Sequence, residues 1–305
     1  MIGPMFTRRG ALLLLGLLAS VPMAPALRAE GATRVIAAGG SVAEIVFALG
    51  AGDRLIARDS TSSFPPEVLD LPDIGYLRTL SAENLLALSP DLILAEHDAG
   101  PPEAVEILQR SGIPLIVLPE AFDAEGVATK IAIVAEALGL PERGAALSGQ
   151  VRASFAQAAG AAAALPHAPK VMFILSMQGG RLMVSGRGTS ADAMIRLAGG
   201  QNAVDGYEGY KALTDEAAIA AAPEIILVMD RSGDLAVTLE DIRAHPALSL
   251  TPAARNGHVV AMDGLYLLGF GPRAGKAAQE LAGRFGDILA GQTGDEAADQ
   301  AGDGG

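Results

Sequence analysis

The sequence has no cysteine among its 305 residues, and this absence limits its chemistry. Without cysteine the chain cannot supply disulfides, thiolate nucleophiles, iron–sulfur ligands or cysteine zinc sites, so its chemistry depends on oxygen and nitrogen donors. Basic residues are also scarce, because 22 lysines and arginines stand against 35 acids and give a formal charge of −13. We therefore expect no nucleic acid and no anionic membrane surface among its partners.

Residues 1–29 are predicted to be a secretory signal peptide. Arg8 and Arg9 give a positive start, and the apolar run over residues 11–21 is shorter than the roughly 20 residues of a membrane-spanning helix. The arginine pair is compatible with a twin-arginine signal, so both export routes stay open. No cysteine follows that could carry a lipid. We expect an exported periplasmic protein that is not lipid-anchored and has no stable membrane insertion after the signal is removed.

The composition is 50% hydrophobic and 19% charged, which is enough apolar material for a large core, and the length suits two domains. Short runs that are apolar throughout, as in strands buried on both faces of a parallel sheet, alternate with longer helical stretches. These runs lie at residues 34–38, 55–57, 92–95, 115–118, 171–175, 225–228 and 258–261. The pattern predicts an α/β fold with two Rossmann-like lobes and mostly parallel sheets, over residues 30–140 and 166–292.

The two halves of the chain resemble each other. Residues 80–94 and 213–227 both read as a capped helix, a proline-marked turn and a buried strand, which indicates diverged copies of one lobe. Between the halves, the alanine-rich stretch 141–165 opens with a proline and is followed by another, as one long rigid helix joining the lobes would be. Residues 293–305 are Gly, Asp, Ala and Glu for the most part, so we expect a disordered acidic tail there.

Three segments carry a resemblance to a known family. The stretches 34–44, 74–83 and 267–273, taken with the two lobes and the connecting helix, resemble the substrate-binding proteins of ABC importers for haem, siderophores and cobalamin. Within that group the second and third stretches are similar to periplasmic haem-binding proteins. The resemblance implies a monomer that performs no turnover, captures ferric haem between its lobes and delivers it to an ABC permease dimer with its ATPase.

Ferric haem needs an axial donor, and without cysteine the candidates are tyrosine, histidine and methionine. Tyr76 and Arg78 lie two apart in a loop, where an extended backbone puts both side chains on one side. A phenolate is stabilised both by the iron and by a neighbouring guanidinium. Spacing alone favours a surface tyrosine beside a solvated arginine. The family resemblance instead implies that Tyr76 is the haem iron ligand and that Arg78 stabilises its phenolate.

Other residues are candidates for the haem pocket. His97 follows the strand at 92–95, and the carboxyl ends of parallel strands are where ligands bind. The loop at 176–181 has no histidine, so a histidine ligand from that loop is not expected, and Met177 is a weak contact or a core residue. The remaining candidates from the second lobe are polar or aromatic side chains suited to a large plate with two carboxylates, or else ordinary surface residues. They are Arg181, Tyr207, Tyr210 and Lys211.

Glu83 and Glu216 occupy equivalent positions in the two halves, each in the first turn of a predicted helix. A carboxylate there also complements the helix dipole, so both could serve only as structural acids. In the family that the chain resembles, one glutamate per lobe at this place meets arginines of the two permease subunits. The resemblance therefore implies that Glu83 and Glu216 are the docking residues for the permease.

Two alternatives remain beside the haem carrier. One is a cobalamin or ferric-siderophore carrier of the same fold. The other, of a different class, is an exported α/β enzyme. The sequence offers no G-x-S-x-G elbow, no nucleotide-binding glycine motif and no histidine pair at zinc spacing. We therefore expect that the protein is not an enzyme.

Overall fold

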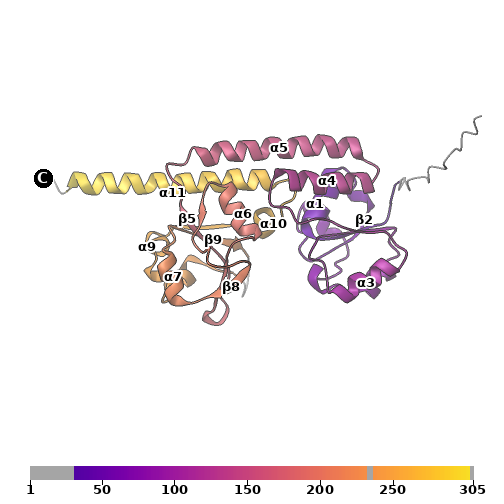
Figure 1. Ribbon diagram of the computed structural model, residues 1–305, viewed down its shortest axis with the longest axis horizontal. Coiled ribbons are helices and arrows are strands. Elements are labelled where there is room, and N and C mark those ends of the chain that lie inside the picture. Colours follow the sequence, from indigo (N-terminus) through magenta and orange to yellow (C-terminus); the bar gives the residue numbers. More distant parts are fainter. Residues whose placement is uncertain (1–30, 232–235, 303–305) are drawn as a thin grey trace, which may run out of the picture.

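The computed structural model describes residues 31–231 and 236–302, with side chains described as far as residue 291. The predicted signal peptide over residues 1–29 lies outside this part of the chain. Figure 1 shows two groups of strands and short helices side by side, with two long helices running along one side of them. No helix of the described ranges is long and apolar enough to cross a bilayer.

The first lobe is built on a four-stranded sheet in the order β2-β1-β3-β4, in which every pair is parallel. Its strands are β1 (Val35–Ala38), β2 (Leu55–Arg58), β3 (Leu92–Ala95) and β4 (Leu115–Val117). The central strands β1 and β3 are buried along their whole length, as their unbroken apolar sequences predict. The helices of this lobe are α1 (Gly40–Ala48), α2 (Ala82–Ala87), α3 (Pro102–Arg110) and α4 (Ala124–Ala137).

The second lobe contains a mixed sheet in the order β10-β9-β5-β6-β8, and β7 pairs with β5. Its strands are β5 (Lys170–Ser176), β6 (Leu182–Ser185), β7 (Gln201–Asn202), β8 (Tyr210–Leu213), β9 (Ile225–Asp230) and β10 (Val259–Asp263). Strand β6 runs antiparallel to both of its neighbours. The predicted α/β fold with two lobes is confirmed, and this sheet departs from a wholly parallel one because β5 turns back directly into β6.

Six helices belong to the second lobe. They are α6 (Ser190–Leu197), α7 (Asp215–Ala221), α8 (Leu239–Ala244), α9 (Pro252–Asn256), α10 (Gly264–Leu268) and α11 (Ala274–Gly302). The last of these runs to Gly302, and the disordered tail expected over residues 293–305 stays a prediction. Alanine, glutamate and glutamine are good helix formers and favour the helical backbone there. Residues 303–305 lie outside the described part of the chain.

One helix, α5 (Pro141–Ala163), spans both lobes. It packs along α4 on the first-lobe side and along α11 on the second-lobe side (Figure 1). Small residues allow the close approach: a Cβ at Gly144 would lie 2.4 Å from the Ala135 Cβ, and one at Gly275 would lie 2.2 Å from the Ser154 Oγ. The lobes are therefore joined by tightly packed helices, which limits their relative motion.

The lobes also meet through a buried ion pair. The Glu44 carboxylate of α1 is almost fully buried and accepts a hydrogen bond of 3.1 Å from the Arg273 backbone N–H and one of 2.9 Å from its Nη2. The Arg273 guanidinium also lies over the Phe64 ring, 3.5 Å from its centroid. Nearby, Phe122 of the first lobe meets Phe270 of the second edge to face, with ring centroids 5.4 Å apart. The ion pair joins two residues that are more than two hundred positions apart in the sequence.

We expect Arg273→Met to destabilise the protein by about 3 kcal/mol, because it leaves the buried Glu44 carboxylate without its cation. Urea denaturation measures the loss. Arg110→Met is the matched control, since Arg110 pairs with Glu106 at 3.2 Å where both side chains are exposed, and such pairs contribute about 0.5 kcal/mol. Equal losses in the two variants would show that the pair between the lobes adds no stability.

Candidate functional site

Tyr76 is placed by a segment that runs beside the end of β2. Backbone hydrogen bonds join Arg58 and Ser60 to residues 72–75 at 2.9–3.0 Å, and Arg58 also forms an ion pair of 3.1 Å with Asp73. This pairing extends the edge of the parallel sheet by one short segment. Tyr76 consequently emerges at the carboxyl end of the first sheet, the edge at which ligands bind in folds of this kind.

Arg78 contacts the Tyr76 hydroxyl, although the backbone over residues 77–79 is a 3-10 turn and not the extended chain expected from the sequence. Its Nη1 donates to the Tyr76 oxygen, and its Nη2 donates to the carboxylate of Asp98, which sequence reasoning did not single out. Partial burial lowers the pKa of the Arg78 guanidinium, but the charges of Asp98 and Tyr76 and the hydrogen bonds to them outweigh it, so the pKa lies above its ordinary value. The Tyr76 side chain is 40% exposed and open to a ligand.

The loop that carries Asp98 is tied to the loop that carries Tyr76. The Gly100 N–H donates to the Leu77 carbonyl at 2.9 Å, and the Leu80 N–H donates to the Gly100 carbonyl at 2.7 Å. Both leucines are buried and hold the short 3-10 helix η3 (Leu77–Thr79) against the core. Main-chain bonds therefore set the distance between the two loops.

A buried charged group lies behind the same loop. The Lys130 side chain, only 3% exposed, donates from Nζ to Glu96 Oε1 at 3.0 Å and to Ser41 Oγ at 2.5 Å. The Ser41 hydroxyl in turn donates to Glu96. Because a buried lysine needs a carboxylate partner, this group anchors the start of the loop that continues into His97 and Asp98.

His97 pairs with a glutamate of the following loop. Its Nε2 lies 3.2 Å from Glu120 Oε1 of the next loop, and both side chains are about half exposed. The structure therefore brings Tyr76 and Arg78 together with Asp98, and it places His97 beside them in a pair of its own.

Asp59 is a buried acid next to the loops described above, and sequence reasoning missed it. Its carboxylate is fully buried and accepts hydrogen bonds from the Gly39 N–H at 3.1 Å, from the Thr61 N–H and hydroxyl at 3.1 and 2.8 Å, and from the Ser62 hydroxyl at 2.8 Å. The polar run directly after β2 is the signal that could have revealed it. Asp59 fixes the turn after β1 to the loop after β2.

The candidates of the second lobe make their contacts within that lobe. The Tyr207 hydroxyl donates to the Val184 carbonyl at 3.1 Å, and burial raises its pKa, so this phenol keeps its proton. The Lys211 ammonium lies 5.4 Å from the Tyr207 ring centroid, and the Tyr210 hydroxyl lies 3.3 Å from Ser190 Oγ.

Two further candidates lie at the turn after β5. Arg181 is exposed next to a glycine-containing 3-10 turn, η4 (Gln178–Gly180). Met177 is half-buried and packs against the apolar cluster of its own lobe, in agreement with a core role.

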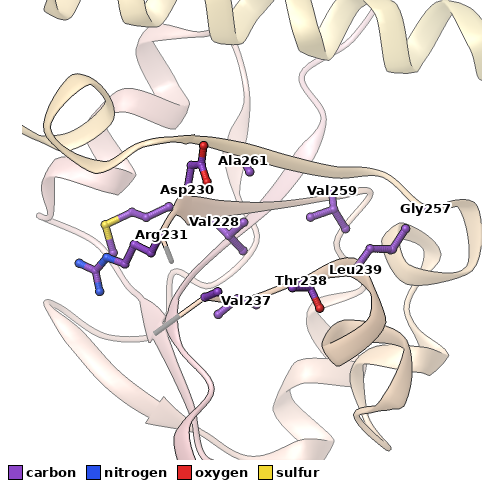
Figure 2. A pocket seen from close by; sticks show the side chains of 11 residues that line it. Val228, Asp230, Arg231, Val237, Thr238, Leu239, Gly257, Val259 and Ala261 are labelled. Carbon is purple, nitrogen blue, oxygen red and sulfur yellow. The ribbon is translucent and has the colours of Figure 1, made fainter. Parts of the chain in front are cut away.

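Two pockets of the described residues do not contain Tyr76. Figure 2 shows the first, of about 310 Å³, beside β9 and β10, where Val228, Val259 and Leu239 line it. The second, of about 470 Å³, lies where the lobes meet and is lined by Phe64 and Arg273 among others. Tyr76 lines neither of these pockets and lies exposed on the first lobe.

Glu83 and Glu216 are exposed in the first turns of α2 and α7. The N-cap of α2 is Ser81, which accepts from the Asn84 N–H at 3.3 Å, and α7 is capped in the same way by Thr214. Since hydroxyl groups cap both helices, neither glutamate is needed for capping. Both carboxylates are available to a partner.

Comparison with known proteins identifies relatives over most of the chain. A family model described as "Periplasmic binding protein" matches residues 35–266. Among solved structures, the chain is similar to the periplasmic heme-binding protein BhuT in complex with two hemes, with a TM-score of 0.81 and 41% identity, covering 85% of this chain and 100% of that one.

Curated relatives have lower identity. The chain is 24% identical over 242 residues to the uncharacterized ABC transporter substrate-binding lipoprotein YvrC of Bacillus subtilis, covering 78% of this chain and 75% of the relative. It is 26% identical over 208 residues to the vitamin B12-binding protein of Pectobacterium atrosepticum, covering 67% of this chain and 74% of the relative.

We expect Asp59→Asn to destabilise the protein by about 1–3 kcal/mol. An asparagine amide offers one acceptor oxygen and one NH₂ donor, so at least one of the groups that donate to Asp59 loses its acceptor. Chemical denaturation measures the change, with the exposed Asp53→Asn as the matched control. A fall in stability no larger than that of the control would contradict the assigned role of Asp59.

Proposed function

The chain belongs to the periplasmic binding protein family, and we propose that it captures ferric haem with Tyr76 as the iron ligand. Proteins of this family bind substrates of the haem, vitamin B12 or siderophore type for transport and are not enzymes. The observation that carries the haem proposal is the contact between Arg78 and the Tyr76 hydroxyl at the ligand-binding edge of the first sheet.

The chemistry of this contact suits ferric iron. Free tyrosine has a pKa near 10, so its anion must be favoured before it can bind a metal at neutral pH. A guanidinium that donates to the phenol oxygen favours the anion, and Fe(III) favours it further. Phenolate is a known axial ligand of haem iron. Tyr76 is exposed enough to reach a ligand between the lobes, whereas Tyr207 keeps its proton through a bond to a carbonyl.

The degree of similarity also supports haem over vitamin B12. The heme-binding relative is 41% identical along its whole length, and the vitamin B12-binding relative is 26% identical over 74% of its length. A cobalamin or ferric-siderophore carrier is the second candidate because of that relative. We assign the walls of the haem site to residues near Tyr76 and across from it in the second lobe. These are Arg78, His97, Met177, Arg181, Tyr207, Tyr210 and Lys211.

The partner we propose is an ABC permease dimer with its ATPase, since a relative is an ABC transporter substrate-binding protein. That relative is a lipoprotein. The 305 residues of this chain contain no cysteine to carry a thioether-linked lipid, so we propose that it acts as a free monomer in the periplasm. One exposed glutamate on each lobe, Glu83 and Glu216, would contact arginines of the two permease subunits.

The haem proposal predicts that Tyr76→Phe loses hemin binding, because the variant keeps the ring and removes the ligand oxygen. Titration of the protein with hemin, followed by the Soret and charge-transfer bands, measures the effect. We expect a loss of affinity beyond the ~10–100-fold that is typical of outer-sphere partners. Tyr266→Phe, which removes a phenol oxygen outside the residues assigned to the haem site, is the matched control and should keep the bands.

Two outcomes would overturn the haem proposal. The first is an unchanged spectrum in Tyr76→Phe. The second is the absence of any Soret shift in the unaltered protein together with saturable binding of cobalamin, which would favour the second candidate.

The docking proposal predicts that Glu83→Lys with Glu216→Lys keeps hemin binding but loses transport. Reversed charges would repel the permease arginines, so stimulation of haem uptake into reconstituted vesicles should fall to the level without binding protein. Glu142→Lys with Asp287→Lys changes the net charge equally on α5 and α11, which lie on the side opposite α3 and α7 (Figure 1). Normal uptake by the first pair, or equal losses in both pairs, would refute specific docking.

A further inference from the structure

The Arg78 guanidinium contacts two partners that belong to different loops. One terminal nitrogen donates to the Tyr76 oxygen, and the other donates to the Asp98 carboxylate. We propose that Asp98 is a positioning residue of the haem site, which holds Arg78 against the Tyr76 oxygen and acts on bound haem only through Arg78. This inference rests on the proposed function. It adds Asp98 to Tyr76 and Arg78 as the third residue of the proposed iron site.

Arg78 needs such a partner because of its length and exposure. Its side chain is 52% exposed, and a long exposed side chain loses substantial rotamer entropy when it is fixed in one place. The planar guanidinium presents its donors in a rigid fork, so a carboxylate that holds one end also sets the direction of the other. Asp98 supplies that carboxylate and is itself only 27% exposed.

Asp98 can act in this way because its loop does not depend on its side chain. The loop begins at Glu96, which is anchored by the buried Lys130 ammonium at 3.0 Å. It ends at Gly100, whose backbone bonds to Leu77 and Leu80 on either side of Arg78. The two loops would therefore keep their places if the Asp98 carboxylate were removed, and only the guanidinium would be released.

The electrostatics agree with this assignment. An arginine guanidinium is a permanent cation, and its hydrogen-bond partners here are the Tyr76 oxygen and the Asp98 carboxylate. The neighbouring His97 plays no part in this, because it pairs with Glu120.

A four-protein cycle tests the proposal: the unaltered protein, Asp98→Ala, Arg78→Ala and the double variant, each loaded with hemin. The rate of haem transfer to excess apomyoglobin and the tyrosinate-to-iron charge-transfer band are measured. We expect each single variant to release haem about 10–100-fold faster, as outer-sphere partners of a metal do. The double variant should release it no faster than Arg78→Ala, since Asp98 acts only through Arg78.

Further variants separate positioning from a general structural effect. Asp98→Asn keeps an acceptor oxygen without the charge and should lie between the unaltered protein and Asp98→Ala in both readouts. Glu106→Ala breaks an exposed arginine pair on α3 at 3.2 Å and should release haem at the unaltered rate. If the effects of Asp98→Ala and Arg78→Ala multiply in the double variant, Asp98 acts independently of Arg78 and the proposal is overturned.

Failure of this inference is distinguishable from failure of the haem proposal. If Tyr76→Phe loses the charge-transfer band while Asp98→Ala keeps the unaltered band and release rate, Tyr76 remains the ligand and only the role of Asp98 is refuted. If the unaltered protein shows no such band with hemin, the haem proposal itself fails, and this inference fails with it.

Discussion

The ion pair between Glu44 and Arg273 fixes how the two lobes meet, and every surface between the lobes depends on it. Glu44 is buried in the first lobe and receives both a backbone and a side-chain hydrogen bond from Arg273. A misplaced lobe would leave this carboxylate buried without a cation, which is costly. The helix α5 packs on α4 and α11 and reinforces the same arrangement from one side. The pair and the helix together give the lobes one preferred relative position.

Within this arrangement of the two lobes, the candidate site is made of loops at the carboxyl ends of strands. Tyr76 follows a segment bonded to the end of β2, and Asp98 follows β3 on the other side of the central strand β1, so parallel strands carry the two loops toward one edge. Main-chain bonds between the loops hold them in register. The fold would serve many ligands, so under the proposed function the choice of haem would depend on the few side chains placed there.

The sequence predicts those helices, strands and contacts that depend on residues close together in the chain. The unbroken apolar runs become the buried strands β1 and β3, and Pro141 marks the first residue of α5. The contact of Tyr76 with Arg78 is expected from the family resemblance and not from spacing alone, which favours a solvated arginine. Asp98 could not be predicted in the same way, because only the pairing of β1 with β3 and the bonds around Gly100 bring it to Arg78. The pair of Glu44 with Arg273 joins the far ends of the chain and leaves no local pattern.

The proposed iron-binding group has a kinetic consequence, since Tyr76, Arg78 and Asp98 all belong to the first lobe. Haem iron would be ligated from that lobe, and the assigned residues of the second lobe would line the other side of the site and slow escape. Because α5 limits how far the lobes can separate, closure would supply little of the affinity. Release of haem at a membrane would then require a structural change at one lobe only. The two halves of a symmetric receptor would therefore play unequal parts in that release.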